Sequence, residues 1–217
     1  MIKEFETIDL NADIKSRKYQ YAMKRIFDII LSIIGIVILS PVYLLIIIAI
    51  KLDSKGPAIF KQVRVGVGEK EFTIYKFRTM IVNAESKRTL DINPNDIENF
   101  VFQNKSDNRI TKVGDVLRKT SLDEIPQLFN VLFGTMSLVG PRPEIPDVVK
   151  YYPETYRQRL MVLPGITGLA QVSGRGEIEL GKTIYYDLRY IKEFSLWLDL
   201  KIIIRTFYNV VKKEGAF

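Results

Sequence analysis

Cysteine and histidine are both missing from this 217-residue sequence. Without cysteine the chain can form no disulfide, and it offers neither a thiolate metal ligand nor a thiol nucleophile. Without histidine it lacks the imidazole base of Ser-His and Cys-His catalysis and a frequent ligand of zinc. Any enzymatic activity of the chain alone therefore has to use a carboxylate, a lysine, a tyrosine or an otherwise assisted hydroxyl.

Charge and composition narrow the choice of partners. The formal net charge of +7 favours an anionic partner, and nucleic acid, anionic lipid and a phosphorylated substrate all qualify. Hydrophobic residues make up 47% of the chain. This is enough to bury the core of one domain, or of one domain together with a membrane element.

One apolar run, residues 26–50, carries Asp28 as its single charge. The run is longer than the roughly 20 residues that cross a bilayer core of about 30 Å, which predicts a membrane segment. Ser40 and Pro41 lie inside it, where proline removes a backbone donor and disfavours helix at the preceding residue. Lysines and arginines flank both ends, so both flanks are expected on the cytoplasmic side. A re-entrant helix, which enters the membrane, breaks and returns, would place both flanks on the cytoplasmic side. A kinked helix that spans the membrane is the alternative, and the flanking charges alone do not decide between the two.

The remaining chain is predicted to be a globular cytoplasmic part without a further span. Residues 56–66 and 71–80 are rich in β-forming side chains on either side of a turn at Gly66 to Lys70, which predicts a hairpin. Residues 133–146 and 163–176 are punctuated by Gly and Pro and are predicted to be loops. Residues 195–213 have helical apolar spacing, which favours an amphipathic core helix, with an interfacial helix against the membrane as the alternative.

The stretch TSLDEIPQLFN, residues 120–130, sets Asp123 and Glu124 against a proline and an apolar run. Ser121 followed by Glu124 matches a capping box, and acids in a first helical turn suit the helix dipole. Pro126 would then occupy a position whose N–H is normally used, so the helix could instead begin nearer Pro126. On either interpretation the two acids stand at a helix entrance.

Basic side chains in strand ends and in loops bounded by Gly and Pro are candidates for binding an anionic substrate. They are Lys76, Arg78, Arg118, Arg142 and Arg175. Guanidinium groups bind phosphate oxygens in a bidentate manner, and several that converge on one pocket would suit a diphosphate. A magnesium ion would need an oxygen ligand, which Glu124 or Asp199 could provide.

Five stretches of the sequence occur together in one known family. They are KRIFDIILS followed by SP, YKFRTM, LRKTSLDEIPQLFNVLFGTMSLVGPRPE, LPGITGLAQVSGR and SLWLDLKIIIRT. With these motifs in the same order, over roughly residues 24–212, the chain resembles the bacterial sugar transferases, the monotopic polyprenol-phosphate phosphoglycosyl transferases.

The resemblance implies transfer of a sugar 1-phosphate from a UDP-sugar to undecaprenyl phosphate, with release of UMP. It implies that Asp123 is the nucleophile, which forms a covalent phospho-sugar intermediate, and that Glu124 helps to hold Mg²⁺. The residues expected to line the site are Lys76, Arg118, Arg142, Arg175 and Asp199. Ser40 and Pro41 are expected to break a re-entrant helix that enters one leaflet of a bacterial inner membrane from the cytoplasmic face.

The fold expected from these features is α+β and mainly helical, with a small hairpin and interfacial amphipathic helices. Residues 1–23 are expected to be a polar segment, residues 24–51 the re-entrant helix, and residues 52–217 a cytoplasmic catalytic domain that starts polysaccharide or glycoconjugate assembly. Larger members of the family carry an N-terminal four-helix membrane domain, so this chain resembles a minimal form. Leu169 and Ala170 stand where many relatives have a tryptophan-containing pair, which leaves the contacts made there open.

Three other functions remain as alternatives. Water in place of the lipid acceptor would make the chain a hydrolase of nucleotide sugars, and its basic face could make it a non-catalytic scaffold on anionic lipid. Nucleic-acid binding is disfavoured because a net charge of +7 is modest and no known binding motif is present. The sugar, the pathway and the formation of a homodimer are not determined by the sequence.

Overall fold

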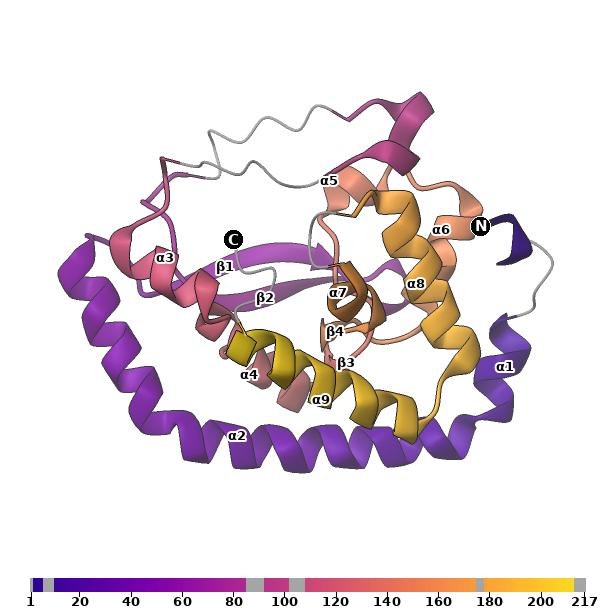
Figure 1. Cartoon of the computed structure of the whole chain (residues 1–217), viewed down its shortest axis with the longest axis horizontal. Helices are drawn as coiled ribbons and strands as arrows, with labels where there is room; N and C mark the ends of the chain where they lie inside the picture. The colour runs from indigo at the N-terminus through magenta and orange to yellow at the C-terminus, as the bar shows by residue number, and fades with distance from the viewer. Residues whose placement is uncertain (1, 6–9, 85–91, 102–107, 175–177, 213–217) are drawn as a thin grey trace.

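The computed structural model describes residues 2–5, 10–84, 92–101, 108–174 and 178–212. Within them the fold is mainly helical, with a small antiparallel hairpin and one long helix near the N-terminus, in agreement with the α+β prediction (Figure 1). The α-helices are α1 (Leu10–Ser16), α2 (Lys18–Asp53), α3 (Lys112–Lys119), α4 (Gln127–Phe133), α5 (Pro146–Val149), α6 (Glu154–Arg157), α7 (Leu169–Gly174), α8 (Leu180–Glu193) and α9 (Leu196–Lys212). The strands are β1 (Ile59–Val65), β2 (Glu71–Phe77), β3 (Ser137–Val139) and β4 (Gly165–Thr167). The 3₁₀ segments are η1 (Ile2–Phe5), η2 (Val67–Glu69), η4 (Pro94–Asn99), η5 (Leu122–Glu124) and η6 (Gln158–Met161).

Helix α2 contains the predicted breaking point, Ser40 and Pro41, in its interior. Pro41 has no N–H to donate to the carbonyl of Val37, and the Ser40 hydroxyl donates to that carbonyl instead (2.8 Å). The helix therefore continues through the pair rather than stopping, and Figure 1 shows that it bends in its second half. An interior proline is the usual cause of such a bend.

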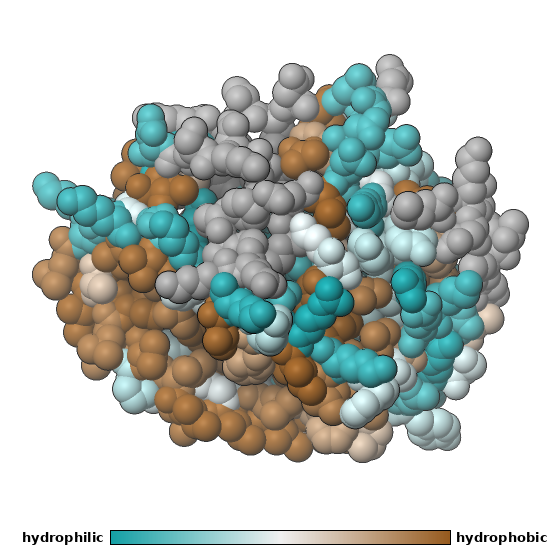
Figure 2. Space-filling view, in the orientation of Figure 1, coloured by the Kyte–Doolittle hydropathy of each residue, from teal (hydrophilic) through white to brown (hydrophobic). Residues whose placement is uncertain are grey.

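Helix α2 lies along the remainder of the chain for most of its length. By length and composition it is, within the described residues, the one helix that could cross a membrane. On the inner side of the helix, Ile46 and Ile50 are buried in one cluster with Phe77 of β2 and Leu117 of α3. Its outer side exposes large apolar side chains, among them Val37, Ile38, Leu44 and Leu45. Figure 2 shows apolar surface gathered along the edge of the molecule where Figure 1 places α2.

The predicted hairpin is confirmed. Strands β1 and β2 are antiparallel, with Phe60 opposite Lys76, and the turn from Gly66 to Lys70 joins them. Gly68 in this turn has a φ of +63°, a left-handed conformation that glycine adopts without steric cost. Because alternate residues of a strand share a face, Gln62, Arg64 and Lys76 lie on the same face of the hairpin.

The two stretches predicted to be loops each contain a short strand, and the second also contains helix α7. Strands β3 and β4 pair in parallel, with Ser137 opposite Gly165 and Val139 opposite Thr167. Gly165 lies so close to the backbone of Gly140 that a Cβ atom would collide with it. The loop prediction was wrong for these residues because three-residue strands between Gly and Pro are too short to leave an alternating pattern.

The main core lies beneath α8. One face of this helix carries four fully buried side chains, Leu180, Ile184, Leu188 and Ile191, at the spacing of a single helical stripe. Residues 1–23, expected to be a polar segment, also contribute Phe5 and Leu10 to this core. The N-terminal segment is therefore part of the same packed body as α8.

Helix α9 confirms the predicted C-terminal helix. Ile202 on its inner side is 2% exposed, whereas Trp197 and Phe207 are 62% and 71% exposed. The first turns of α9 contact α2 through an ion pair between Lys24 and Asp199. In Figure 1 the two helices run next to each other along the same side of the molecule.

Candidate active site

The acid pair stands in a tight turn between α3 and α4. Helix α3 ends at Lys119, Ser121 adopts a left-handed conformation with a φ of +55°, and η5 then carries Asp123 and Glu124. The Ser121 side chain makes no capping hydrogen bond, so the capping-box interpretation was wrong. Helix α4 begins directly after Pro126, which confirms the alternative start and fits a residue that has no N–H to donate.

Helix α2 and strand β2 hold this turn from two sides. The Tyr43 hydroxyl of α2 donates to the carbonyl of Ile125 (2.7 Å). Arg25, also of α2, donates to the carbonyls of Val131 and Leu132 at the end of α4 (2.6 and 3.1 Å). Asn130 of α4 bonds the β2 backbone through both of its amide atoms. These contacts bring the turn to the hairpin face that carries Lys76.

Glu124 is bound by two cations. Its Oε1 accepts from Nζ of Lys76 (2.7 Å) and from NH2 of Arg142 (2.9 Å), and its side chain is 18% exposed. Burial acts to raise the pKa of Glu124, but Arg142 and Lys76 outweigh it and hold this pKa well below the ordinary value. Burial lowers the pKa of Lys76, and the charge of Glu124 opposes that shift. Glu124 is therefore ionised at any physiological pH.

Asp123 has a different environment. Its side chain is partly buried, and among the described residues it makes no hydrogen bond and no ion pair. Burial, with the neighbouring charge of Glu124, raises the pKa of Asp123 to about 6, while Lys76, Arg142 and Arg118 act to lower it. At neutral pH this side chain is a carboxylate that has no bound partner among the described residues, which is the state that a nucleophile requires.

Arg118 is the third cation beside the pair. It projects from α3, where its Nε donates to the Thr79 hydroxyl (3.0 Å), and it is close enough to act to lower the pKa of Asp123. Gly114 permits this arrangement, because any Cβ at that position would collide with the backbone carbonyl of Thr79. The absence of a side chain thus lets α3 lie against the backbone that follows β2 and brings Arg118 to the site.

Two residues predicted to line the site, Arg78 and Asp199, make their contacts elsewhere in the structure. The Arg78 guanidinium is buried and donates to the carbonyls of Ser54 and Lys55, just after the end of α2. The Asp199 carboxylate accepts from Lys24 (2.5 Å) and from the Tyr190 hydroxyl (2.8 Å). Arg175 lies outside the described residues. The structure therefore brings together Lys76, Arg118 and Arg142 around the acid pair, and it does not bring Arg78 or Asp199 there.

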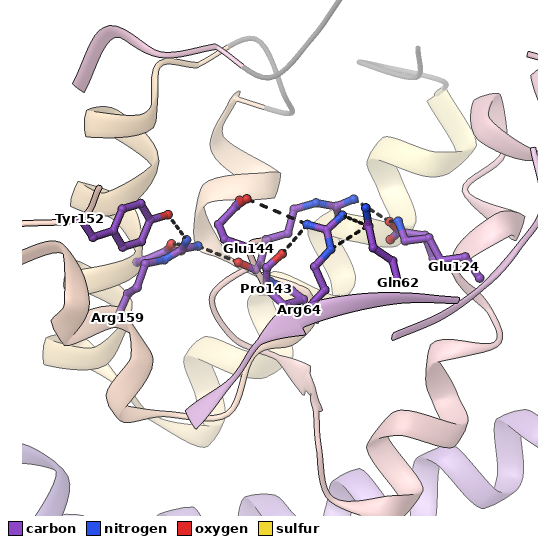
Figure 3. Close-up of polar contacts among 10 residues, drawn as sticks. Gln62, Arg64, Glu124, Pro143, Glu144, Tyr152 and Arg159 are labelled. Atoms are coloured by element: carbon purple, nitrogen blue, oxygen red, sulfur yellow. Dashed lines mark hydrogen bonds and ion pairs between the residues drawn. The ribbon is translucent and has the colours of Figure 1, made fainter. Parts of the chain in front are cut away.

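Three polar residues near the site were missed by sequence reasoning. Gln62 and Arg64 of β1 share the hairpin face of Lys76, and Figure 3 shows them between Glu124 and the loop that carries Arg142. Gln127 is 2% exposed, and its Nε2 has no acceptor within the described part of the chain. Together with Arg64, Lys76 and Arg142 it lines one small hollow. The polar alternation of Gln62 and Arg64 in a predicted strand was the available signal.

The fold and the site define a class of protein: a mainly helical domain with a long apolar helix and a pair of adjacent acids, of which Glu124 is bound by two cations and Asp123 has no partner among the described residues. Comparison with known families is more specific. The chain belongs to the bacterial sugar transferase family, whose profile, described as "Bacterial sugar transferase", matches residues 19–213. The family resemblance of the sequence motifs is thereby confirmed.

Individual relatives agree with the family. An uncharacterized sugar transferase of Haemophilus influenzae is 46% identical, over 90% of this chain and 42% of the relative. A UDP-glucose:undecaprenyl-phosphate glucose-1-phosphate transferase of Klebsiella pneumoniae is 45% identical, over 89% of this chain and 41% of the relative. An undecaprenyl-phosphate galactose phosphotransferase of Salmonella typhimurium is 43% identical, over 90% and 42% respectively. The chain thus spans less than half the length of these curated relatives.

Proposed function

We propose that the chain is a phosphoglycosyl transferase that moves a sugar 1-phosphate from a UDP-sugar to undecaprenyl phosphate and releases UMP. The Klebsiella and Salmonella relatives, which are named for transfer to undecaprenyl phosphate, support this reaction. The observation that carries the proposal is the contrast within the acid pair. Glu124 is held ionised by Lys76 and Arg142, whereas Asp123 is a carboxylate without a partner among the described residues.

The reaction proceeds in two displacements at the same phosphorus. A carboxylate oxygen of Asp123 attacks the phosphorus that bears the sugar, a new O–P bond forms, and UMP leaves with the electrons of the broken P–O bond. A phosphate oxygen of undecaprenyl phosphate then attacks the aspartyl phosphate and restores the free carboxylate. Carboxylate nucleophiles form such intermediates without an imidazole base. This fits a chain that has no histidine.

The cations around the pair would stabilise charge on the phosphates. In phosphoryl transfer the protein contributes mainly positioning and charge stabilisation. Arg118 and Arg142 stand beside Asp123 and would meet the diphosphate, and Lys76 would keep Glu124 in place. We include Arg175 in this set on the resemblance alone.

Glu124 would hold Mg²⁺ together with oxygens of the bound diphosphate. No group of three or more acidic side chains gathers within the described residues. Protein-bound Mg²⁺ commonly uses one or two carboxylates plus substrate phosphates, so the single carboxylate of Glu124, whose two cations both bind Oε1, is compatible with this ion. The ion would neutralise negative charge on the diphosphate. EDTA should therefore abolish UMP release and added MgCl₂ should restore it, whereas activity that survives chelation would argue against a metal.

We further propose that α2 is re-entrant in the cytoplasmic leaflet of the bacterial inner membrane. Support comes from contacts near both of its ends with one globular body: Lys24 reaches Asp199, and Asp53 accepts from the backbone N–H of Val113. The exposed apolar side chains of α2 and α9 would then enter lipid, with α9 at the interface. The site would lie where a soluble nucleotide sugar and a membrane-bound polyprenol both arrive, at the first step of glycoconjugate assembly.

The reaction is tested by substituting the nucleophile. Asp123→Asn keeps the shape of the side chain but removes the attacking carboxylate, so UMP release from UDP-sugar in the presence of undecaprenyl phosphate should fall roughly 10⁴-fold. Asp115→Asn is the matched control, because Asp115 forms an exposed ion pair with Lys119 on α3, and it should leave the rate unchanged. Full activity of Asp123→Asn would refute the assignment, and sugar phosphate formed without lipid would favour a hydrolase.

A further inference from the structure

A buried polar cluster lies behind the loop that carries Arg142. Arg159 of η6 and Asp187 of α8 form an ion pair of 2.6 Å in which each side chain is 1% exposed. The same guanidinium donates to the Tyr152 hydroxyl (2.9 Å) and to the backbone carbonyl of Arg142 (2.8 Å). These three residues, Tyr152, Arg159 and Asp187, are called the Arg159 cluster below. Figure 3 shows Tyr152 and Arg159 at one end of a row of polar contacts that reaches Glu124 at the other.

The loop between the cluster and the site is held at successive residues. Arg64 donates to the carbonyl of Pro143 (2.9 Å), and the Val65 N–H donates to the carbonyl of Glu144 (2.8 Å). Pro141 and Pro143 flank Arg142, and each proline ring restricts its own φ. With the carbonyl of Arg142 bound by Arg159, little backbone freedom is left at the residue whose guanidinium binds Glu124.

We propose that Arg159 and Asp187 are positioning residues for the transfer reaction: they hold the backbone of Arg142 so that its guanidinium meets Glu124 and the substrate phosphates. This inference rests on the proposed function for its catalytic part. Burial of a charged pair is costly and adds little net stability, so a role in fold stability alone does not account for the pair. A misplacement of about 1 Å in a group that stabilises transferred charge can cost about 10²-fold in rate. Such a penalty is large enough to give the cluster a functional role.

The test separates positioning from folding. Arg159→Met alone would leave Asp187 as an uncompensated buried charge, and the variant could fail to fold. The double variant Arg159→Met/Asp187→Leu replaces the pair with apolar side chains of similar volume, an exchange that is often neutral or stabilising. We expect it to stay folded, with a melting temperature lowered only by the loss of a donor to the Tyr152 hydroxyl and the Arg142 carbonyl, and with kcat for UMP release lower by about 10- to 100-fold. A folded double variant with wild-type kcat would overturn the proposal.

Combining the double variant with a substitution of Arg142 tests whether the cluster affects the rate through Arg142. In an Arg142→Lys background, which already lacks the guanidinium, the double variant should cost little further activity, because both changes disturb one interaction. An undiminished additional loss would mean that the cluster does not act through Arg142. Arg157→Gln is the matched control two residues away, since Arg157 pairs with Glu69 and donates to the Val149 carbonyl, and within the described chain it makes no hydrogen bond or ion pair to residues 140–144. Its kcat should equal that of the wild type.

Hydrogen exchange tests the clamp without any substrate. The Val65 amide, which donates to the carbonyl of Glu144, should exchange faster in the double variant, while amides of α8 keep their protection. Unchanged exchange at Val65 and at residues 140–144 would refute the clamp. If wild-type protein released no UMP yet exchange in the double variant were faster, the proposed function would fail while the clamp would stand.

Discussion

Asp123 and Glu124 are neighbours in the chain, yet their carboxyl groups lie in different electrostatic environments. Glu124 is bound by Lys76 and Arg142 and keeps its charge, whereas burial raises the pKa of Asp123 to about 6. Two carboxyls whose surroundings separate their pKa values can take separate chemical roles at one pH. If Asp123 attacks as a carboxylate, its ionisation should limit the rate in mildly acidic solution.

The value of kcat/KM for UMP release should therefore rise with pH and level off above a pH of about 6. Below that value protonation removes the nucleophile, so the rate should fall about tenfold per pH unit. Initial rates measured from about pH 5 to about pH 8 at low substrate concentration give the profile of the free enzyme. A profile that is flat through pH 6 would contradict the assigned nucleophile.

Thermal melting provides a second check on the same group. A carboxyl whose pKa is about 6 when folded and 3.8 ordinarily stabilises the fold below its ordinary pKa, and this contribution is lost as the pH rises through 6. Asp123→Asn removes the titration. The variant should therefore melt above the wild type at neutral pH and close to it near pH 4. A lower melting temperature of the variant at neutral pH would show that the charged form of Asp123 is stabilising.

Helix α2 provides contacts to the site as well as an apolar surface. Tyr43 bonds the backbone at Ile125, Arg25 bonds the end of α4, and Asp53 accepts from the Val113 N–H at the start of α3. These three side chains are spread along the helix: Arg25 precedes Pro41, and Tyr43 and Asp53 follow it. The bend therefore lets one helix contact the elements on both sides of the acid pair.

Tyr43→Phe should loosen the turn that carries the acids. The substitution removes one hydrogen bond of 2.7 Å to the residue that follows Glu124, and it should cost about 1 kcal/mol of stability and lower the rate of UMP release. Tyr19→Phe is the matched control, because Tyr19 is 85% exposed and its hydroxyl should matter for neither property. The melting temperature in detergent measures stability, and an assay of UMP release measures the rate. If Tyr43→Phe equals the wild type in both measurements, α2 does not support the turn.

The arrangement of the whole chain favours one of the two membrane topologies considered for α2. Both halves of α2 pack on one globular body, and its exposed apolar side chains lie on the same side of the molecule as those of α9 (Figures 1 and 2). A straight spanning helix would carry one end to the far side of the bilayer, away from the body that both ends contact. The re-entrant proposal keeps both ends on one side.

Single cysteines can locate the two ends, because the natural sequence contains none and gives no background. Tyr19→Cys and Leu52→Cys place a thiol near each end of α2 at positions that are 85% and 84% exposed. An impermeant maleimide should label both variants in inverted membrane vesicles and neither in intact spheroplasts. Val116→Cys on α3 reports the side of the globular body. Labelling of the two ends from opposite sides would establish a spanning helix.

Local patterns in the sequence predicted much of the fold. Three features follow from patterns among residues close together in the chain, and all three are present: the long apolar helix, the hairpin around Gly66 to Lys70 and the C-terminal helix. The start of α4 beside Pro126 followed from the missing N–H of proline. The strands β3 and β4 were not predicted, because each consists of three residues and exists only through pairing with the other.

The sequence alone was sufficient for the family and the long apolar helix, because motif order and hydrophobic run length are properties of the linear chain. Only the tertiary structure decided which partner each charged side chain contacts. Arg78 and Arg142 look alike in the sequence, yet one closes the end of α2 and the other binds Glu124. The different pKa shifts of Asp123 and Glu124, and the contact of Arg159 with the loop, arise from groups brought together across the fold. Desolvation and Coulomb interactions depend on distance in space, which the order of residues does not specify.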